Sequence, residues 1–186
     1  MSKIDAKISS SLFPIGVFLI SCGEIGKNAN IVTMGWVIPI SSNPPLLGIS
    51  LGKRRHSYEL IKNAKDFVVN IPTREILKET DHCGNVSGRD VNKFKKTGLT
   101  PLPGKIVKSP LIKECPINLE CKVIKDIELG DHNFIVGEVV SKSFDEKILN
   151  EKEKPDINKM NLFSYGSNRY FTIGEVIGKW GFSLKE

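Results

Sequence analysis

The sequence contains few of the residues and patterns that build several common kinds of site. Its 186 residues include four cysteines and three histidines. The cysteines (Cys22, Cys83, Cys115 and Cys121) form no CxxC pair and no zinc-ligand spacing, so no metal site is expected and they are interpreted as buried, reduced thiols. The chain has no G-x-G-x-x-G fingerprint, internal repeat, low-complexity tract or apolar run of transmembrane length. These absences argue against a zinc scaffold, a repeat protein and a helical membrane protein.

The composition is that of a packed globular chain with a basic excess. Hydrophobic residues make up 40% and charged residues 26%, which predicts a single domain over residues 1–186. The formal net charge of +6 favours anionic partners. The basic residues are spread along the chain, so nucleic-acid binding is disfavoured, and the reduced thiols favour a cytoplasmic location without membrane attachment.

The first residues allow two interpretations. An apolar run over residues 12–20 follows Lys3 and Lys7 and ends in the sequence LISC at Cys22, which resembles a bacterial lipoprotein cleavage box. Asp5 precedes the run, and Pro14 and Gly16 interrupt an already short apolar core. We therefore favour a first buried strand over the lipoprotein signal.

Apolar, β-branched runs bounded by Gly, Pro, Asn and Ser dominate the chain. They predict strands at residues 15–21, 30–39, 46–51, 67–71, 117–128, 133–144 and 170–173. The sequence SSNPP predicts a turn between the second and third strands, and Gly130-Asp131 predicts a hairpin. Short helices are predicted at residues 56–63, 73–80 and 90–97, the last with Asp90 as N-cap and Gly98 as its stop. Residues 147–159 are predicted to form an exposed loop. Many strands with few helices indicate a mainly β fold built as a closed antiparallel barrel.

A basic cluster follows the third predicted strand in the sequence ISLGKRRHSYEL. After the turn at Gly52, Lys53, Arg54, Arg55, His56 and Ser57 lead into a predicted helix. A helix N-terminus presents unpaired N–H groups, and guanidinium and hydroxyl donors add to them, so the segment is typical of a phosphate site. A solvated basic turn is the alternative.

The strand NIVTMGW suggests a flat contact surface. Alternation places Val32, Met34, Trp36 and Ile38 on one face and the smaller Thr33, Gly35 and Val37 on the other. Gly35 permits close approach of a planar ring, whose polar edge would meet Thr33 and backbone groups. The side chains of Met34 and Trp36 are expected in the core.

Two further segments offer candidate site residues. In NVSGRDVNKF, Ser87, Gly88 and Arg89 can line the mouth of a pocket, with Lys93 and Phe94 at its edge; an N-capped surface helix is the alternative. In GDHNFIVGEVV, His132 stands at the hairpin turn, where an imidazole can face a redox centre or be merely exposed.

These segments together resemble one known family. NIVTMGWVIPISSNPPLLGISL, KRRHS, DFVVNIP, SGRDVNKF and GDHNFIVGEV occur in the order and spacing of the flavin reductase-like, FMN-binding split-barrel family. The branch they resemble most contains flavoredoxins and archaeal ferric-reductase-type proteins. The resemblance spans residues 13–170. It implies a six-stranded Greek-key split barrel that binds FMN noncovalently as a homodimer.

The resemblance also implies a role for each matching position. Thr33, Met34, Gly35 and Trp36 would meet the flavin ring, and Ser50, Leu51, Lys53, Arg54, His56 and Ser57 would hold the phosphate. Ser87, Gly88, Lys93 and Phe94 would lie beside the flavin where an electron donor approaches. His132 matches a histidine near the reactive face, and Tyr170 would border the site.

The leading functional hypothesis is an FMN-dependent oxidoreductase or electron carrier. It would take electrons from NAD(P)H or a redox protein and deliver them to ferric complexes, free flavin or another protein. The absence of a convincing catalytic dyad fits, because the cofactor supplies the chemistry. One alternative is a noncatalytic FMN-binding module. Another is a nucleic-acid-binding barrel, which is disfavoured because Trp36, Phe67 and Phe134 fall within apolar runs and are predicted to be buried.

Overall fold

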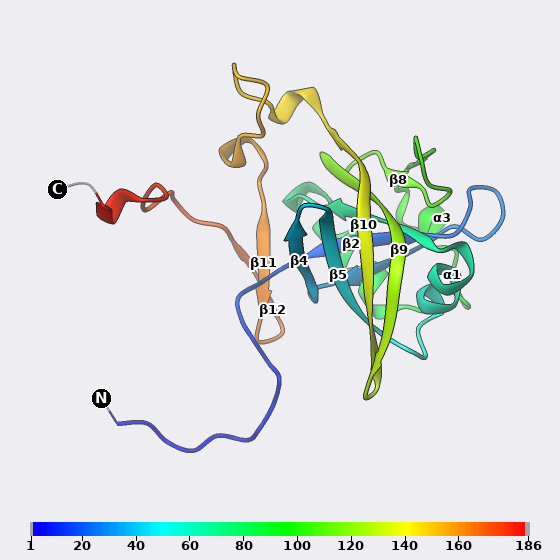
Figure 1. Cartoon of the computed structure of the whole chain (residues 1–186), viewed down its shortest axis with the longest axis horizontal. Coiled ribbons are helices and arrows are strands. Elements are labelled where there is room, and N and C mark those ends of the chain that lie inside the picture. The colour runs from blue at the N-terminus through cyan, green and yellow to red at the C-terminus, as the bar shows by residue number, and fades with distance from the viewer. Residues whose placement is uncertain (1, 185–186) are drawn as a thin grey trace.

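Seven antiparallel strands form the main sheet of the protein (Figure 1). The structure is a computed structural model that describes residues 2–184. The order across the sheet is β3-β2-β6-β9-β10-β5-β4. The strand bounds are β2 Phe18–Cys22, β3 Asn30–Met34, β4 Val37–Ser42, β5 Pro45–Gly52, β6 Asp66–Ile71, β9 Ile117–Leu129 and β10 His132–Phe144.

The sheet closes where the chain passes from β3 to β4. These strands are the two ends of the sheet order, yet only Gly35 and Trp36 separate them along the chain. The Ser50 N–H donates to the carbonyl of Trp36 at 3.0 Å, so the connection is itself tied to β5. A single strand over residues 30–39 was therefore a wrong prediction, because the chain bends there. Counted as one bent strand, β3 and β4 give the six strands expected of the split barrel, and the mainly β class is confirmed.

A second, smaller sheet stands beside the barrel. The predicted first strand divides into β1 (Ile15–Gly16) and β2, and β1 pairs with β11 (Phe163–Gly166), which pairs with β12 (Arg169–Thr172). Strand β11 was not predicted. Its hairpin turns through Ser167 and Asn168, both with positive φ, which short polar residues tolerate in two-residue turns. The LISC sequence lies within β2, between β3 and β6.

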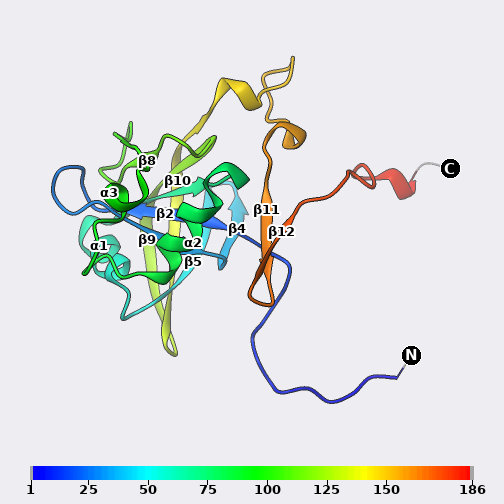
Figure 2. The ribbon, with the colours of Figure 1, turned by 180° about the vertical axis from the view of Figure 1, so that it is seen from behind.

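The α-helices of the described residues, α1, α2 and α3, lie on one side of the barrel (Figure 2). They are α1 (His56–Ala64), α2 (Leu77–Asn85, preceded by the 3₁₀ turn η1, Arg74–Ile76) and α3 (Lys93–Thr97). The predicted helix at 73–80 thus runs further than expected. The predicted cap of α3 was wrong: the side chain of Asn92, and not of Asp90, accepts the Lys95 N–H at 3.0 Å. Gly98, in the left-handed region at φ 76°, ends α3 as predicted.

The apolar side chains divide between two cores. Alternate residues of the strands, among them Ile20, Val32 and Phe67, fill the barrel interior, and α1 closes one end of it with Leu60 and Ile61. The intervening residues point outward under α2 and α3. This second core contains Leu19, Ile31, Ile76, Cys83, Phe94, Leu99, Ile112 and Cys115. Strands β2 and β3 are thus buried on both faces, which explains their nearly continuous apolar runs.

The remaining segments are short or extended. They are β7 (Pro101–Leu102), β8 (Leu111–Ile112) and the 3₁₀ turns η2 (Glu146–Ile148), η3 (Ile157–Lys159) and η4 (Phe182–Leu184). The loop at 147–159 is mostly exposed as predicted, but Ile148 anchors it in a small cluster with Ile117 and Met160. Residues 2–14 and 173–184, the N-terminal and C-terminal arms, extend away from the barrel (Figures 1 and 2). No helix within residues 2–184 has the length and apolarity needed to cross a membrane.

Candidate functional site

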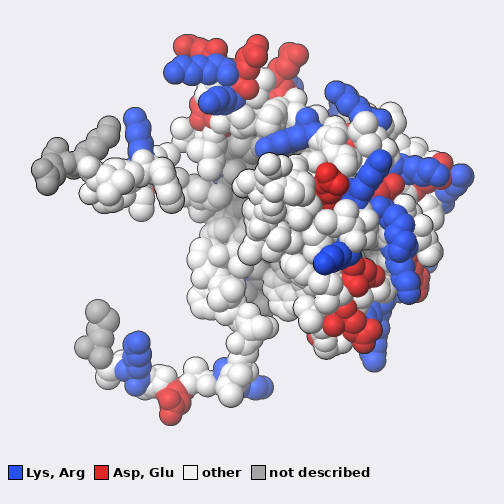
Figure 3. Space-filling model, in the orientation of Figure 1, with Lys and Arg blue, Asp and Glu red and all other residues white. Residues whose placement is uncertain are grey.

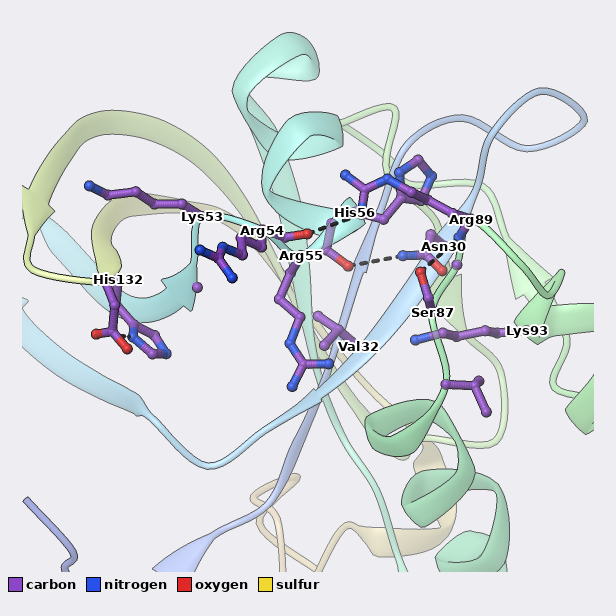
Figure 4. Close-up of a pocket in the computed structure, with 15 residues that line it drawn as sticks. Asn30, Val32, Lys53, Arg54, Arg55, His56, Ser87, Arg89, Lys93 and His132 are labelled. Carbon is purple, nitrogen blue, oxygen red and sulfur yellow. Dashed lines mark hydrogen bonds and ion pairs between the residues drawn. The ribbon is translucent and has the colours of Figure 1, made fainter.

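The basic turn between β5 and α1 forms one wall of a cavity of about 770 Å³ (Figure 4). Lys53, Arg54, Arg55 and His56 line it on one side, and the loop between α2 and α3 lines the other. Figure 4 shows the Arg55 and Lys93 side chains pointing into it from opposite sides. Cationic groups converging on one cavity favour an anionic ligand. We call this the basic cavity.

The N-terminus of α1 opens onto the basic cavity without a side-chain cap. Arg55 stands at the N-cap position in extended conformation, and its side chain accepts no hydrogen bond from the helix. The buried Ser57 in the first turn accepts a hydrogen bond from the Asn30 amide at 2.9 Å, which ties the helix start to β3. The uncapped N–H groups and the positive end of the helix dipole therefore face the cavity, where an anion can satisfy them.

Lys93 brings a buried cation to the same cavity. Only 3% of the residue is exposed, and its ammonium donates to the carbonyl oxygens of Ile31 at 2.8 Å and Cys83 at 2.6 Å. Burial lowers the pKa of Lys93, and the nearby Arg55 charge adds to this effect. Within residues 2–184 no carboxylate pairs with Lys93, so an anion in the cavity would relieve the cost of burying its charge.

Arg89 bridges the loop and the basic turn. Its guanidinium donates to the Arg54 carbonyl at 3.0 Å and to the Glu59 carboxylate at 2.6 Å. That contact holds the pKa of Glu59 below its usual range. Next to Arg89, Gly88 packs so closely against the Asn30 amide that a side chain there would collide with it. The loop is thus fixed against both β3 and α1.

A second cavity, of about 560 Å³, adjoins the first. Val32, Gly52, Arg55 and His132 line both, so the two cavities share a wall. Aromatic rings surround the second one, which we call the ring cavity: Trp36, His132, Tyr165 and Tyr170. Flat apolar walls with a few polar groups are typical of a site for a planar organic ligand.

His132 lies at the junction of the two cavities. Its Nδ1 is 2.8 Å from the Asp131 carboxylate, and its ring lies 5.0 Å from that of Trp36, centroid to centroid. The contact with His132 holds the pKa of Asp131 below its usual range. His132 Nε2 lies next to Gly52, because a Cβ placed on that glycine would be 3.6 Å from it. Gly52 lines both cavities, so Nε2 faces the wall that they share. Asp131 therefore orients the imidazole with its other nitrogen toward the site.

The hairpin β11–β12 forms the outer wall of the ring cavity. Its Tyr170 hydroxyl donates to the Asp81 carboxylate of α2 at 2.8 Å, and the Tyr165 and Tyr170 rings lie 5.3 Å apart. Burial and this bond raise the pKa of Tyr170, so the hydroxyl stays protonated and can donate at neutral pH. One hydrogen bond thus fastens the hairpin to the helical side of the site.

Every predicted site residue except Phe94 lines one of the two cavities. The structure divides these residues between the two cavities differently from the predicted division between phosphate and ring. Ser50 and Leu51, predicted to hold phosphate, line the ring cavity, whereas Ser87, Gly88 and Lys93, predicted beside the ring, line the basic cavity. The other predicted positions are Thr33, Met34, Gly35, Trp36 and Tyr170, which line the ring cavity, and Lys53, Arg54, His56 and Ser57, which line the basic cavity. Phe94 is buried in the second core and lines neither cavity.

The small residues Thr33 and Gly35 line the ring cavity, but they also pack against other elements. Thr33 donates to the carbonyl of Thr80 of α2, and Ile15 of β1 lies beside Gly35. Met34 is buried as predicted, but Trp36 is 47% exposed, because the alternation of β3 ends at the bend. The small residues therefore accommodate α2 and β1, and Trp36 itself supplies a wall of the ring cavity.

The family resemblance assigned no flavin contact to several residues that line the cavities. Arg55 and Arg89 were predicted only as members of the basic turn KRRHS and of a pocket mouth in SGRD. Tyr165 and Asn168 depend on the hairpin, which the sequence YGSNRY could have indicated through a two-residue polar turn between aromatic residues.

The four cysteines are free and buried, in agreement with the interpretation as reduced thiols. Burial raises the pKa of Cys83 to about 11 and of Cys22 to about 12. Both thiols are therefore protonated at neutral pH and do not act as nucleophiles. No cluster of His, Cys, Asp and Glu suited to a metal ion occurs in the described part of the chain.

The fold and the site define a split-barrel protein with adjoining cavities for an anionic group and a planar ring. The family model described as "Flavin reductase like domain" matches residues 10–172, and the chain belongs to that family. A flavoredoxin from Methanosarcina acetivorans is similar in structure, with a TM-score of 0.90, 35% identity and full coverage of both chains. The flavoredoxin of Desulfovibrio vulgaris (Miyazaki F) is also similar in structure, with a TM-score of 0.91 and 31% sequence identity. The match covers 99% of this chain and 100% of the flavoredoxin. An uncharacterized protein of Archaeoglobus fulgidus is 41% identical over 159 residues, 84% of this chain and 88% of the relative.

The bond between Tyr170 and Asp81 generates a first prediction. Tyr170→Phe removes the hairpin's hydroxyl contact with α2, so amide hydrogen exchange over residues 163–172 should become about 5-fold faster, the equivalent of about 1 kcal/mol. Tyr165→Phe is the matched control, because its hydroxyl bonds only to Asn168 within the hairpin, at 3.0 Å. Equal exchange rates in the two variants would show that the Tyr170 bond does not hold the hairpin.

Proposed function

We propose that this protein binds FMN and transfers electrons as an oxidoreductase of the flavin reductase-like family. The observation that carries the proposal is that the basic and ring cavities lie next to each other and share Val32, Gly52, Arg55 and His132. A ligand that joins a planar ring to a phosphate through a short chain needs this arrangement. The family match and the two similar flavoredoxins support a flavin-binding, electron-transferring role.

The residues present fit the phosphate end of FMN. The basic cavity offers the uncapped start of α1, the guanidinium groups of Arg54 and Arg55, and the buried ammonium of Lys93. A phosphate dianion would accept hydrogen bonds from these donors and offset their mutual repulsion. Arg55, which lines both cavities, would contact the ligand near the link between its two halves.

The ring cavity fits the other end of FMN. Trp36, Tyr165 and Tyr170 provide aromatic surface, and the backbone of β3 and β5 passes along the cavity beside them. Bound FMN would supply hydride and single-electron transfer. The protein's own residues would orient the ring, exclude water from one side of it, and set its electrostatic environment through Arg55 and the imidazole of His132. Asp131 would hold that imidazole in place.

The electron donor that we propose is NAD(P)H or a reduced redox protein. The acceptors would be ferric complexes, free flavin or another redox protein. The proposed chemistry depends on the bound flavin, which supplies the redox centre. A noncatalytic FMN-binding module would use the same cavities and differ only in lacking turnover.

A binding experiment tests the phosphate site. Arg54→Ala, at a residue that lines the basic cavity and not the ring cavity, should weaken FMN binding about 10- to 100-fold, about 1.5–3 kcal/mol for a lost charge-assisted hydrogen bond, and leave riboflavin binding within about 2-fold, because riboflavin lacks the phosphate. Flavin fluorescence titration measures both. Lys62→Ala, on the following helix α1 but outside both cavities, is the control. Equal losses for FMN and riboflavin would place the phosphate elsewhere, and no flavin binding by the unaltered protein would refute the proposal.

A second experiment tests turnover. The FMN-loaded protein is mixed anaerobically with NADH or NADPH, and the loss of flavin absorbance is followed by stopped flow. We expect reduction by at least one nicotinamide at a rate that supports turnover. If neither reduces the flavin but a reduced protein carrier does, the electron-carrier version stands. If no donor reduces it, the noncatalytic module is the correct alternative.

We also propose that the protein is a homodimer whose partner covers the ring cavity. Trp36, just before β4, and Ile38 and Ile40 on β4 are exposed apolar residues, and Trp36 lines that cavity. We call these three residues the apolar stripe. The two arms carry further exposed apolar side chains, such as Ile8 and Trp180, and both arms point away from their own barrel. Figure 3 shows few charged side chains over the hairpin beside this stripe. Such surface is typical of a protein–protein interface, and a second copy of the chain supplies matching apolar surface.

Light scattering during gel filtration tests the dimer. The unaltered chain should elute as a dimer, and Ile38→Glu combined with Ile40→Glu should shift it to a monomer, because two buried carboxylates would oppose association. Ile124→Glu, on a similarly exposed isoleucine of β9, is the control and should remain dimeric. A monomeric unaltered protein at micromolar concentration would refute the dimer without bearing on FMN binding.

A further inference from the structure

His132 stands at the end of the long hairpin β9–β10, where the main sheet gives little support. In the described part of the chain, β6 pairs with β9 only as far as Lys122, so residues 123–129 pair with β10 alone. On the other side of β10, strand β5 ends at Gly52, opposite His132. A hairpin without further contacts is only marginally stable in water. The imidazole therefore keeps its position only if other elements hold this end of the hairpin.

Three side chains from different elements meet behind His132. The Tyr58 hydroxyl of α1 donates to the Asp126 carboxylate of β9 at 2.9 Å. The NH₂ group of Asn133 donates to the Tyr58 hydroxyl oxygen at 2.9 Å and to the other carboxylate oxygen of Asp126. These bonds form a closed triangle, so each side chain is held by the other two. We call Tyr58, Asp126 and Asn133 the β10 clamp.

The β10 clamp lies on the opposite face of β10 from His132. Successive side chains of a strand point to opposite faces, and Asn133 pairs with the buried Leu51, whereas His132 pairs with Gly52. Asn133 is 5% exposed, so water competes little for its hydrogen bonds. Burial and the bond to Asp126 raise the pKa of Tyr58, so its hydroxyl stays protonated and donates at neutral pH.

The β10 clamp also connects His132 to the start of α1. Tyr58 directly follows Ser57, which lines the basic cavity and is bonded to Asn30 of β3. The other contact at this end of the hairpin is the ion pair of Lys53 with Glu128, whose side chain is 74% exposed. Exposed ion pairs contribute little to stability. The distance between the phosphate donors of α1 and the imidazole is therefore set mainly through Tyr58.

We infer that Tyr58, Asp126 and Asn133 are positioning residues that hold His132 at the wall shared by the basic and ring cavities. The consequence for binding rests on the proposed function: a flavin that spans both cavities binds tightly only while the imidazole keeps its distance from the start of α1. None of the three side chains lines either cavity, so they act on such a ligand through His132.

Nuclear magnetic resonance of the flavin-free protein tests the position of His132 directly. Its ring lies 5.0 Å from that of Trp36, so protons of the two rings should show a nuclear Overhauser effect. Tyr58→Phe removes only the hydroxyl and Asn133→Ala removes the amide, and each should reduce this effect at least 3-fold. Ser143→Ala is the control, because it removes a hydrogen bond to Asn118 at the other end of β10, and it should leave the effect unchanged.

Flavin binding gives a second measurement, which separates positioning from general stability. Tyr58→Phe should weaken FMN binding about 5-fold in the unaltered background and less than about 1.5-fold in a His132→Ala background. The effect should disappear there because a positioning residue acts through the residue that it holds. Equal losses in the two backgrounds would show that the β10 clamp does not act through His132, and the inference would be wrong.

The outcomes distinguish this inference from the proposed function. If FMN binds and Tyr58→Phe leaves the contact between His132 and Trp36 unchanged, the β10 clamp does not position the imidazole and only the inference fails. If Asn133→Ala does not fold, Tyr58→Phe decides alone. If the flavin-free variants lose the contact but the unaltered protein binds no flavin, the positioning role is supported and the proposed function fails.

Discussion

Closure of the barrel through two residues is the constraint on which the rest of the structure depends. β3 and β4 lie at opposite ends of the sheet order, and only Gly35 and Trp36 connect them. At Gly35 a Cβ would come within 2.3 Å of the terminal methyl group of Ile15, so any larger residue requires the Ile15 side chain to move. The bend also ends the alternation of β3, which turns Trp36 out of the core and toward His132. The same two-residue connection thus closes the sheet and builds a wall of the ring cavity.

The basic cavity carries an electrostatic cost that a ligand would offset. The uncapped start of α1, the arginines of the basic turn and the buried Lys93 all present positive charge to one space. Backbone carbonyls hold the Lys93 ammonium without neutralising it. Such an arrangement destabilises the empty fold slightly and prepares the site for an anion, because donors already in place lose little freedom on binding. The Asn30–Ser57 bond and the Arg89 bridge keep these donors in position.

Local patterns in the sequence were sufficient for most strands, the hairpin at Gly130 and the stop of α3 at Gly98, because each depends on neighbours along the chain. Errors arose where contacts between distant segments of the chain determine the local structure. The single strand at 30–39 failed because closure bends it, and Phe94 was misplaced because α3 packs its aromatic side chain into the second core. Likewise, only the fold shows that Ser50 faces the ring cavity while Ser87 and Lys93 meet the basic turn, since their relative positions depend on the packing of α2 and α3 on β3.

The sequence by itself determined the mainly β class, the basic helix start after β5 and the position of His132 at a hairpin end. Through motifs in a characteristic order, it also determined the membership in the flavin reductase-like family. Each of these features depends on residues that are adjacent in the sequence or regularly spaced along it. The tertiary structure alone decided that the two cavities share a wall, that Tyr170 fastens the hairpin β11–β12 to α2, and that Tyr58 of α1 bonds to the hairpin that carries His132. Those features depend on contacts between residues far apart in the chain, whose distances are set by barrel closure and helix packing and by no local pattern.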